Sequence, residues 1–329
     1  MLGSPLHSRP PLPDKDGALD DHELRAARAL ATTGYWLPAQ TVIAAAGTGW
    51  ERRGHRITVL GEAAADGGGG WLDEWLAAAP DDPTAITLNA ATLSLRASKA
   101  RGSASAAGTT REQFLRFDEL SAAAQVQAQR AVAVDRADPA PCTILCRTMY
   151  SRGDGDGFHA ALAEGRRRDP FDFDLNARAV DFHCAKWFGS HDTMFAIARG
   201  TADAAPPGVG VTMLPLLAHL EYAMREFSWG RVTDRTVKDS RAYFQRPDVQ
   251  QEVDACVAKW HAAGPPAHPK AVLCDNWLAI VYALGSRRRE CRAVFRRIGP
   301  YAATHLWTCF FGSQAGGFLA NWRWANSIG

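Results

Sequence analysis

The stretch AALAEGRRRDPFDFDLNARAVDFHCAKWFGSHDTMFAIARGTADAAPPG, residues 160–208, decides the fold. It reads as three helices, with a break at Asp169-Pro170, a short Gly-Ser turn, and a double proline at its end. A further break at Asp138-Pro139 lies 31 residues before Asp169-Pro170, and Pro207 lies 37 residues after Pro170. Helix pairs that recur at roughly this interval are typical of tetratricopeptide-like repeats.

The rest of the chain continues this pattern and predicts an all-α fold, a tetratricopeptide-like α-solenoid of antiparallel helix pairs. No alternating strand pattern of useful length occurs. At the Gly-Ser turn we expect Gly189 to adopt the left-handed conformation and Ser190 to cap the next helix. Helices are expected to begin near Asp20 and to cover residues 40–46, 51–65, 71–79, 84–100, 111–136, 141–150, 157–168, 171–187, 191–204, 209–227, 248–262, 271–285 and 287–298, before an aromatic capping tail.

The chain is expected to form one domain preceded by a flexible arm. Residues 1–20 hold four prolines among small and charged residues, which leaves too little apolar surface to order them. A glycine run at 67–70 and a polar, irregular stretch at 228–240 divide the rest. Residues 21–329 are predicted to be a single helical-repeat domain, with divergent N-terminal helices over 21–66, core repeats over 71–227, and C-terminal repeats and a cap over 240–329.

Composition favours an ordered globular chain without a nucleic-acid or membrane partner. Of the 329 residues, 47% are hydrophobic and 22% are charged, which is near the usual values for globular proteins. The 37 basic residues nearly balance the 35 acidic ones, so the net charge of +2 creates no basic field that would attract nucleic acid. No apolar run approaches the roughly 18 residues of a membrane-spanning helix.

Cysteine usage and the N-terminal sequence favour a cytoplasmic location. The seven cysteines are odd in number and irregularly spaced, which is typical of reduced, buried thiols and not of a disulfide framework. The first residues, MLGSPLHSRPPLPDKDG, lack the apolar segment of a signal peptide.

The segment CAKWFGSHD at 184–192, with Met-Phe-Ala at 194–196 and the preceding Asp-Pro break, carries a family resemblance. It resembles a tetratricopeptide-like family of uncharacterised bacterial proteins that share a KWFGSH-type turn. The resemblance extends from about Asp82 to Gly208, and residues 298–307 are similar to that family's C-terminal segment. It implies stacked antiparallel helix pairs whose inner helices line a concave, peptide-binding groove, and it implies no catalytic residues.

The leading functional hypothesis is therefore an adaptor that binds a protein or peptide. Three asparagines interrupt helices that are expected to pack within the array, and asparagine is a poor residue for a helix interior. In peptide-binding tetratricopeptide proteins, inner-helix Asn, Lys and Arg residues hold the peptide. By residue type and helix, the partner-binding candidates are Asn89, Asn176 and Asn276, with Arg96, Lys99, Arg147, Arg178 and Lys186 as the cations.

The alternative hypothesis is an enzyme, or a metal-dependent accessory protein of a biosynthetic pathway, with a pocket between helices. His183, His219 and Glu221 are its weak candidates for metal ligands, because their spacing completes no zinc motif. His219 and Glu221 are two residues apart and do not face one another on a helix. No Walker loop, G-x-S-x-G elbow or HExxH helix occurs, so we expect neither catalysis nor a cofactor.

Overall fold

Residues 9–102 and 108–327 are the part of the chain that the computed structural model describes. Within this part the chain forms α-helices and no β-strand, which confirms the predicted all-α class. Residues 1–8 of the expected arm lie outside it. The elements are α1 (His22–Ala31), α2 (Leu37–Ala44), α3 (Trp50–Ala63), the π-helix η1 (Ala64–Gly68), α4 (Gly70–Ala78), α5 (Pro83–Arg101), α6 (Arg111–Val134), α7 (Ala140–Arg152), α8 (Gly155–Arg168), α9 (Phe173–Phe182), α10 (His191–Ala204), the 3-10 helix η3 (Gly210–Met213), α11 (Leu214–Phe227), α12 (Asp234–Phe244), α13 (Pro247–His261), α14 (Ala271–Leu284), α15 (Arg288–Ile298), α16 (Leu306–Phe311) and α17 (Gln314–Asn326).

Side-chain caps determine where the helices around the Asp-Pro break begin. Asp172 accepts a hydrogen bond from the Leu175 amide at 2.7 Å and caps α9. Ser190 accepts one from the Thr193 amide at 3.1 Å and caps α10, as predicted. Each cap satisfies an amide that the first helical turn leaves without a partner.

Helix α9 ends at Phe182, before its predicted end at Trp187. The chain folds back there, because the Phe188 amide donates to the Phe182 carbonyl at 3.2 Å. A Cβ on Gly189 would come within 2.1 Å of the His183 carbonyl oxygen. Close approach of the backbone therefore requires this glycine, and the predicted left-handed conformation does not occur.

Two segments that the sequence predicted to be irregular are ordered. Helix α12 lies within the polar stretch and is capped by Thr233. The described part of the N-terminal arm packs against the C-terminal region, where the Asp14 amide donates to Pro300 at 2.8 Å and the Ala302 amide donates to Asp14 at 2.7 Å. Hydrogen bonds to a distant segment fix this stretch, which local composition does not reveal.

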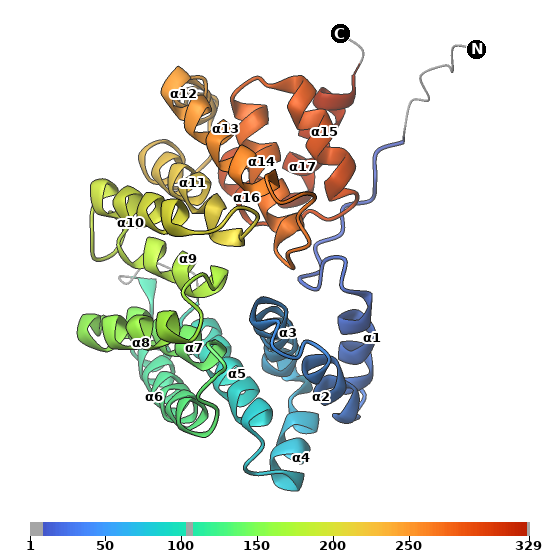
Figure 1. Cartoon of the computed structure of the whole chain (residues 1–329), viewed down its shortest axis with the longest axis vertical. Coiled ribbons are helices and arrows are strands. Elements are labelled where there is room, and N and C mark those ends of the chain that lie inside the picture. Colours follow the sequence, from blue (N-terminus) through green and yellow to red (C-terminus); the bar gives the residue numbers. More distant parts are fainter. Residues whose placement is uncertain (1–8, 103–107, 328–329) are drawn as a thin grey trace.

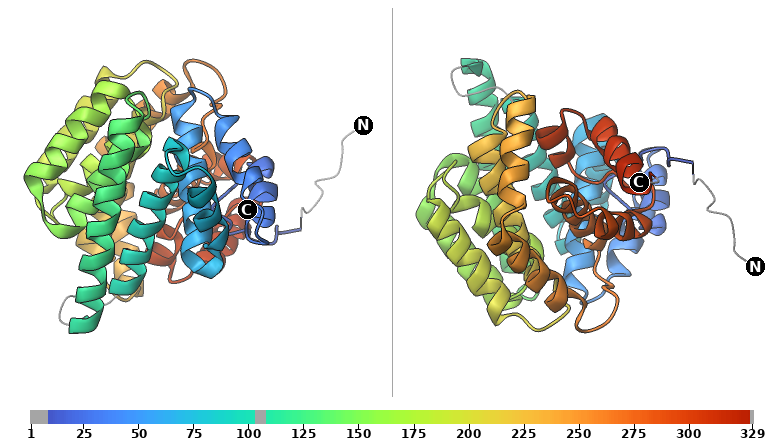
Figure 2. Two further views of the ribbon diagram at one scale, coloured as in Figure 1. Left: turned by 90° about the horizontal axis from the view of Figure 1, so that it is seen from below. Right: turned by 90° about the horizontal axis from the view of Figure 1, so that it is seen from above.

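The helices follow one another around the molecule in chain order, so that α1–α3 lie beside the C-terminal helices (Figure 1). Figure 2 shows from two further directions that the first helices of the chain lie next to the last ones. The link between Asp14 and residues 300–302 is part of this closure. None of the described helices is long and apolar enough to cross a membrane.

Two apolar clusters form the core. One is built from helices up to α9 and contains Trp71, Trp75 and Phe158; the other is built from α9 onward and contains Trp260 and Trp307. Both use residues of α9, so this short helix joins them. Polar residues of α3, α5, α7 and α9 lie beside the first cluster, and Ile57 and Ile144 belong both to that cluster and to the lining of a pocket.

Removing the carboxylate that pairs with Arg53 should strongly destabilise the fold. Arg53 of α3 binds Asp138 at 2.7 Å, with side chains only 8% and 1% exposed. In Asp138→Asn the guanidinium stays buried without its counter-charge, and we expect the free energy of unfolding to fall by about 3–5 kcal/mol in chemical denaturation. Asp81→Asn is the control, because Asp81 is 90% exposed in its pair with Arg130, and its effect should stay within about 1 kcal/mol. Equal effects of the two changes would contradict this assignment.

Candidate functional site

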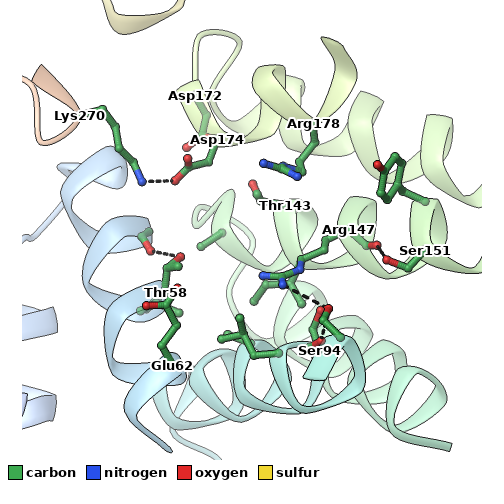
Figure 3. A pocket seen from close by; sticks show the side chains of 18 of the residues that line it. Thr58, Glu62, Ser94, Thr143, Arg147, Ser151, Asp172, Asp174, Arg178 and Lys270 are labelled. Carbon is green, nitrogen blue, oxygen red and sulfur yellow. Dashed lines mark hydrogen bonds and ion pairs between the residues drawn. The ribbon is translucent and has the colours of Figure 1, made fainter. Parts of the chain in front are cut away.

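A polar pocket of about 620 Å³ lies between α3, α5, α7 and α9, a volume typical of small-molecule sites. Two loops complete it, one through Lys270 and one through His305. Figure 3 shows polar side chains from several of these elements converging on one space. The polar residues of the lining are Thr58, Glu62, Ser94, Ser98, Thr143, Arg147, Tyr150, Ser151, Asp172, Asp174, Arg178, Lys270 and His305.

Arg147 of α7 is the cation of this lining that has no carboxylate partner within ion-pair distance among the described residues. Its guanidinium donates to the Ser98 hydroxyl at 3.3 Å. Burial, together with the nearby charge of Arg178, lowers the pKa of Arg147 to about 10. The group is therefore still charged at neutral pH, and most of its donors remain available to an anion.

The other two cations of the lining are paired. Lys270 binds Asp174 at 3.0 Å, and Arg178 binds Asp181 at 2.9 Å. Burial opposes the charge on Lys270, but Asp174 outweighs it and raises the pKa of the ammonium group. Asp181 likewise raises the pKa of Arg178. Both residues keep their charge, and their partners offset most of it.

Glu62 of α3 lines the pocket across from Arg147 (Figure 3), and it is exposed because it also borders a second hollow beside Arg28. No Lys, Arg or His of the described chain lies within ion-pair distance of its carboxylate. Partial desolvation at the pocket rim raises the pKa of Glu62, and the charge of Arg147 partly opposes this rise. The pocket thus presents one unpaired positive and one unpaired negative side chain from opposite sides.

Hydroxyl groups cover much of the remaining wall. Those of Thr58, Ser98 and Ser151 donate to helix carbonyls of their own helices, which leaves their oxygens able to accept. The Thr143 hydroxyl is buried without a hydrogen-bond partner among the described residues, and it lies beside Arg178 (Figure 3). A ligand with several polar groups can therefore find donors and acceptors close to Arg147.

A buried cluster of titratable groups backs the Lys270 side of the pocket. Glu51 of α3 accepts from the Phe173 amide at 2.6 Å and lies 3.3 Å from His268. Burial and the charge of Asp174 raise the pKa of Glu51 to about 8. Burial and the nearby ammonium of Lys270 lower the pKa of His55 to about 3 and that of His268 to about 4.

Asp172 connects this cluster to the pocket, because its carboxyl group interacts with Glu51 and belongs to the lining. Burial, reinforced by Glu51 and Asp174, raises the pKa of Asp172. At neutral pH this side of the pocket therefore holds a largely neutral Glu51 and neutral imidazoles around the Lys270–Asp174 ion pair. Such a concentration of perturbed groups in one pocket is a general marker of functional sites.

Of the cations that the sequence nominated for partner binding, Arg147 and Arg178 line the pocket. Lys186 lies on the surface, stacked over the rings of Trp187 and Trp229 at 5.1 and 4.9 Å.

The two nominated cations of α5 support the neighbouring π-helix. Arg96 donates to the Ala64 carbonyl at 3.0 Å, and Lys99 pairs with Asp66 in an exposed ion pair. Like Lys186, both residues lie outside the pocket lining.

The nominated asparagines do not line it either. Asn176 is fully buried and bonds Arg166 and the Asp172 carbonyl, at 2.9 and 2.8 Å. Asn276 is also fully buried and accepts from the Trp307 indole at 2.8 Å. Internal hydrogen bonds give both residues a structural role in place of the expected contact with a partner. Asn89 is half-buried on α5, outside the lining.

The three weak metal candidates do not form one site. His219 is buried and bonds the Tyr243 hydroxyl at 2.7 Å and Glu252 at 2.9 Å. Glu221 is half-buried, and burial together with Asp181 raises its pKa to about 7. His183 is the C-cap residue of α9. In the described residues no three His, Cys, Asp or Glu side chains form a group that could hold a metal ion.

Sequence reasoning missed Glu62, Thr143, Asp174 and Lys270. They come from four separate segments, and no spacing rule relates them because only the closed arrangement of helices brings them together. The alternation Phe-Asp-Phe-Asp at 171–174 was a usable signal, since aspartates directly after an Asp-Pro break mark a helix start.

No protein-family model, curated protein or solved structure matches the chain. These comparisons assign neither a family nor an activity, so the functional argument rests on the pocket.

The raised pKa of Glu51 predicts a pH-dependent stability. Between its unfolded value near 4.5 and about 8, folded Glu51 keeps a proton that the unfolded chain releases, so the free energy of unfolding falls as pH rises. His55 and His268 act in the opposite direction, but only below about pH 6.5. Asp169, Asp172, Asp174 and Lys270 also face this carboxyl group.

We therefore expect Glu51→Gln to gain stability relative to the original chain by about 1–2 kcal/mol between pH 6 and 8, measured by denaturation at each pH. Glu119→Gln is the control, because Glu119 is 67% exposed on α6. Parallel stability profiles for Glu51→Gln and the original chain would show that Glu51 is ionised in the folded state.

Proposed function

We propose that this chain is a ligand-binding protein whose central pocket holds a small zwitterionic ligand, such as an amino acid or a short peptide. Arg147 would bind the carboxylate of the ligand, and Glu62 would bind its ammonium group. One observation carries the proposal: these two charged side chains face the same pocket from opposite walls without an ion-pair partner, whereas Lys270 and Arg178 are paired.

The chemistry of Arg147 supports a carboxylate as the anionic group. A guanidinium offers a planar fork of donors that matches the two oxygens of a carboxylate. Partial burial strengthens such a contact, because the surroundings screen charge less than bulk water does. The hydroxyl groups of Ser98 and Ser151 lie on the same wall and add polar contacts.

The dimensions of the pocket favour a short ligand. About 620 Å³ accommodates an amino acid derivative or a peptide end, but not a folded domain. The expected protein or peptide ligand therefore remains part of the proposal, but only the end of its chain would fit into the pocket. A tetratricopeptide-like array, with α3, α5, α7 and α9 as inner helices, is the finer architecture that we propose with it. Six buried cysteines favour a cytoplasmic location.

The test is a thermal-shift panel of free amino acids and short peptides. At least one compound should raise the melting temperature of the original chain. Its N-acetylated and C-amidated forms should each lose most of the effect, because each lacks one of the two charges. No stabilising compound in the panel would overturn the proposal.

Variants assign the two charges to their residues. Arg147→Met and Glu62→Gln should each weaken binding of the active compound by roughly 10–100-fold in calorimetry, the usual cost of losing a hydrogen bond to a charged group. Arg152→Met and Glu119→Gln are matched controls on exposed parts of α7 and α6 and should bind normally. Unchanged affinity in the Arg147 and Glu62 variants would place the ligand elsewhere.

Asp172 supports a second candidate function, an enzyme acting in the same pocket. A carboxyl group whose pKa is raised by burial, and which lines the pocket together with Lys270 and Asp174, is a candidate general acid. Asp172→Asn keeps the cap of α9 and should leave binding intact while abolishing any conversion of the bound compound, followed by mass spectrometry. An unchanged compound after incubation with the original chain would eliminate this candidate.

A further inference from the structure

Two histidines meet outside the pocket, on the face formed by α8 and the end of α9. His159 is exposed on α8, and His183 is half-buried at the C-cap of α9. Their Nε2 atoms are 3.4 Å apart, and their rings are inclined by 66°. Neither residue lines the pocket, so the role of this pair is independent of the proposed function.

The other ring nitrogens determine the tautomers. His159 Nδ1 lies 2.7 Å from the Gly155 carbonyl, and His183 Nδ1 lies 2.8 Å from the Ala179 carbonyl. A carbonyl oxygen only accepts hydrogen bonds, so each Nδ1 must carry a proton and donate it. In the neutral rings both Nε2 atoms are therefore unprotonated, and two lone pairs point toward one another. A proton on one ring or a metal cation between the two rings would relieve the repulsion of these lone pairs.

We propose that His159 and His183 form a two-histidine site for a tetrahedrally coordinated transition-metal ion, with Zn²⁺ as the fitting ion. With Zn–N bonds of about 2.0–2.1 Å and a tetrahedral angle, two ligand nitrogens lie about 3.3–3.4 Å apart. The observed 3.4 Å matches this separation. Octahedral coordination at a similar bond length would require about 3.0 Å.

The surroundings hold both rings in this geometry. Phe182 contacts both imidazoles, with ring centroids 5.4 Å from His159 and 5.0 Å from His183. Phe158 stacks on Phe182 at 3.9 Å and fixes its position from below. Metal-binding histidines commonly donate their second ring nitrogen to a carbonyl, as both do here, which fixes ring orientation and raises ligand basicity.

The site supplies two protein ligands, since no group of three is present in the part of the chain that the structure describes. Water or a side chain of another molecule would occupy the remaining coordination positions of the ion. The bound ion is therefore exchangeable, in contrast to the closed four-ligand sites that hold structural zinc.

Calorimetric titration of the tag-free full chain with Zn²⁺ alone tests the proposal. We expect one ion per chain at this site and an affinity loss of at least about tenfold in His159→Gln and in His183→Gln. His22→Gln is the control, because His22 is an exposed helical histidine away from this pair, and it should bind Zn²⁺ as the original chain does.

A spectroscopic readout separates the site from other histidines. With Cu²⁺ as a paramagnetic probe ion in place of Zn²⁺, electron paramagnetic resonance should show coupling to two imidazole nitrogens, and His159→Gln should reduce this to one or none. His159 is exposed, so this variant is expected to fold, which its melting temperature will verify. Equal Zn²⁺ affinity in all four proteins, or a proton shared between the rings in the presence of Zn²⁺ by nitrogen NMR, would overturn the proposal.

Discussion

The ion pair between Lys270 and Asp174 is the contact on which the closed arrangement of helices depends. Lys270 precedes α14, Asp174 lies in the first turn of α9, and His55 of α3 lies 3.5 Å from the ammonium group. Lys270 is 8% exposed, so its charge is removed from most of its water. Loss of either partner would leave a buried charge without compensation, and this penalty keeps the loop before α14 against α3 and α9.

Closure of the helical array explains why the pocket is polar. The described helices build two apolar clusters, and polar side chains of α3, α5, α7 and α9 meet beside the first of them. Because the chain returns on itself, the loops through Lys270 and His305 cover this space. The lining residues Gly54 and His305 are thus far apart in sequence but share one cavity.

The helices could be predicted from sequence because breaks, caps and apolar spacing are local signals. Ser190 shows this, since its capping role depends only on the residues that follow it. The end of α9 could not be predicted, because the fold-back at Gly189 depends on packing against His183. Arg147 could be selected from its residue type and its helix. The place of Glu62 and Lys270 in the pocket could not be predicted, because it depends on segments that are distant in the sequence. Asn276 marks the opposite error, in which an unusual helix residue satisfies buried groups of its own fold.

Stability alone does not account for the groups left without protein partners. Elsewhere this fold compensates its buried charges, as between Arg53 and Asp138, because an uncompensated one is costly. Arg147 is half-buried and Glu62 is exposed, and neither has an ion-pair partner among the described residues, while the Nε2 atoms of His159 and His183 lie 3.4 Å apart. We propose that ligands account for their chemistry, through ion pairs with a bound molecule in the pocket and coordination of a metal cation on the surface.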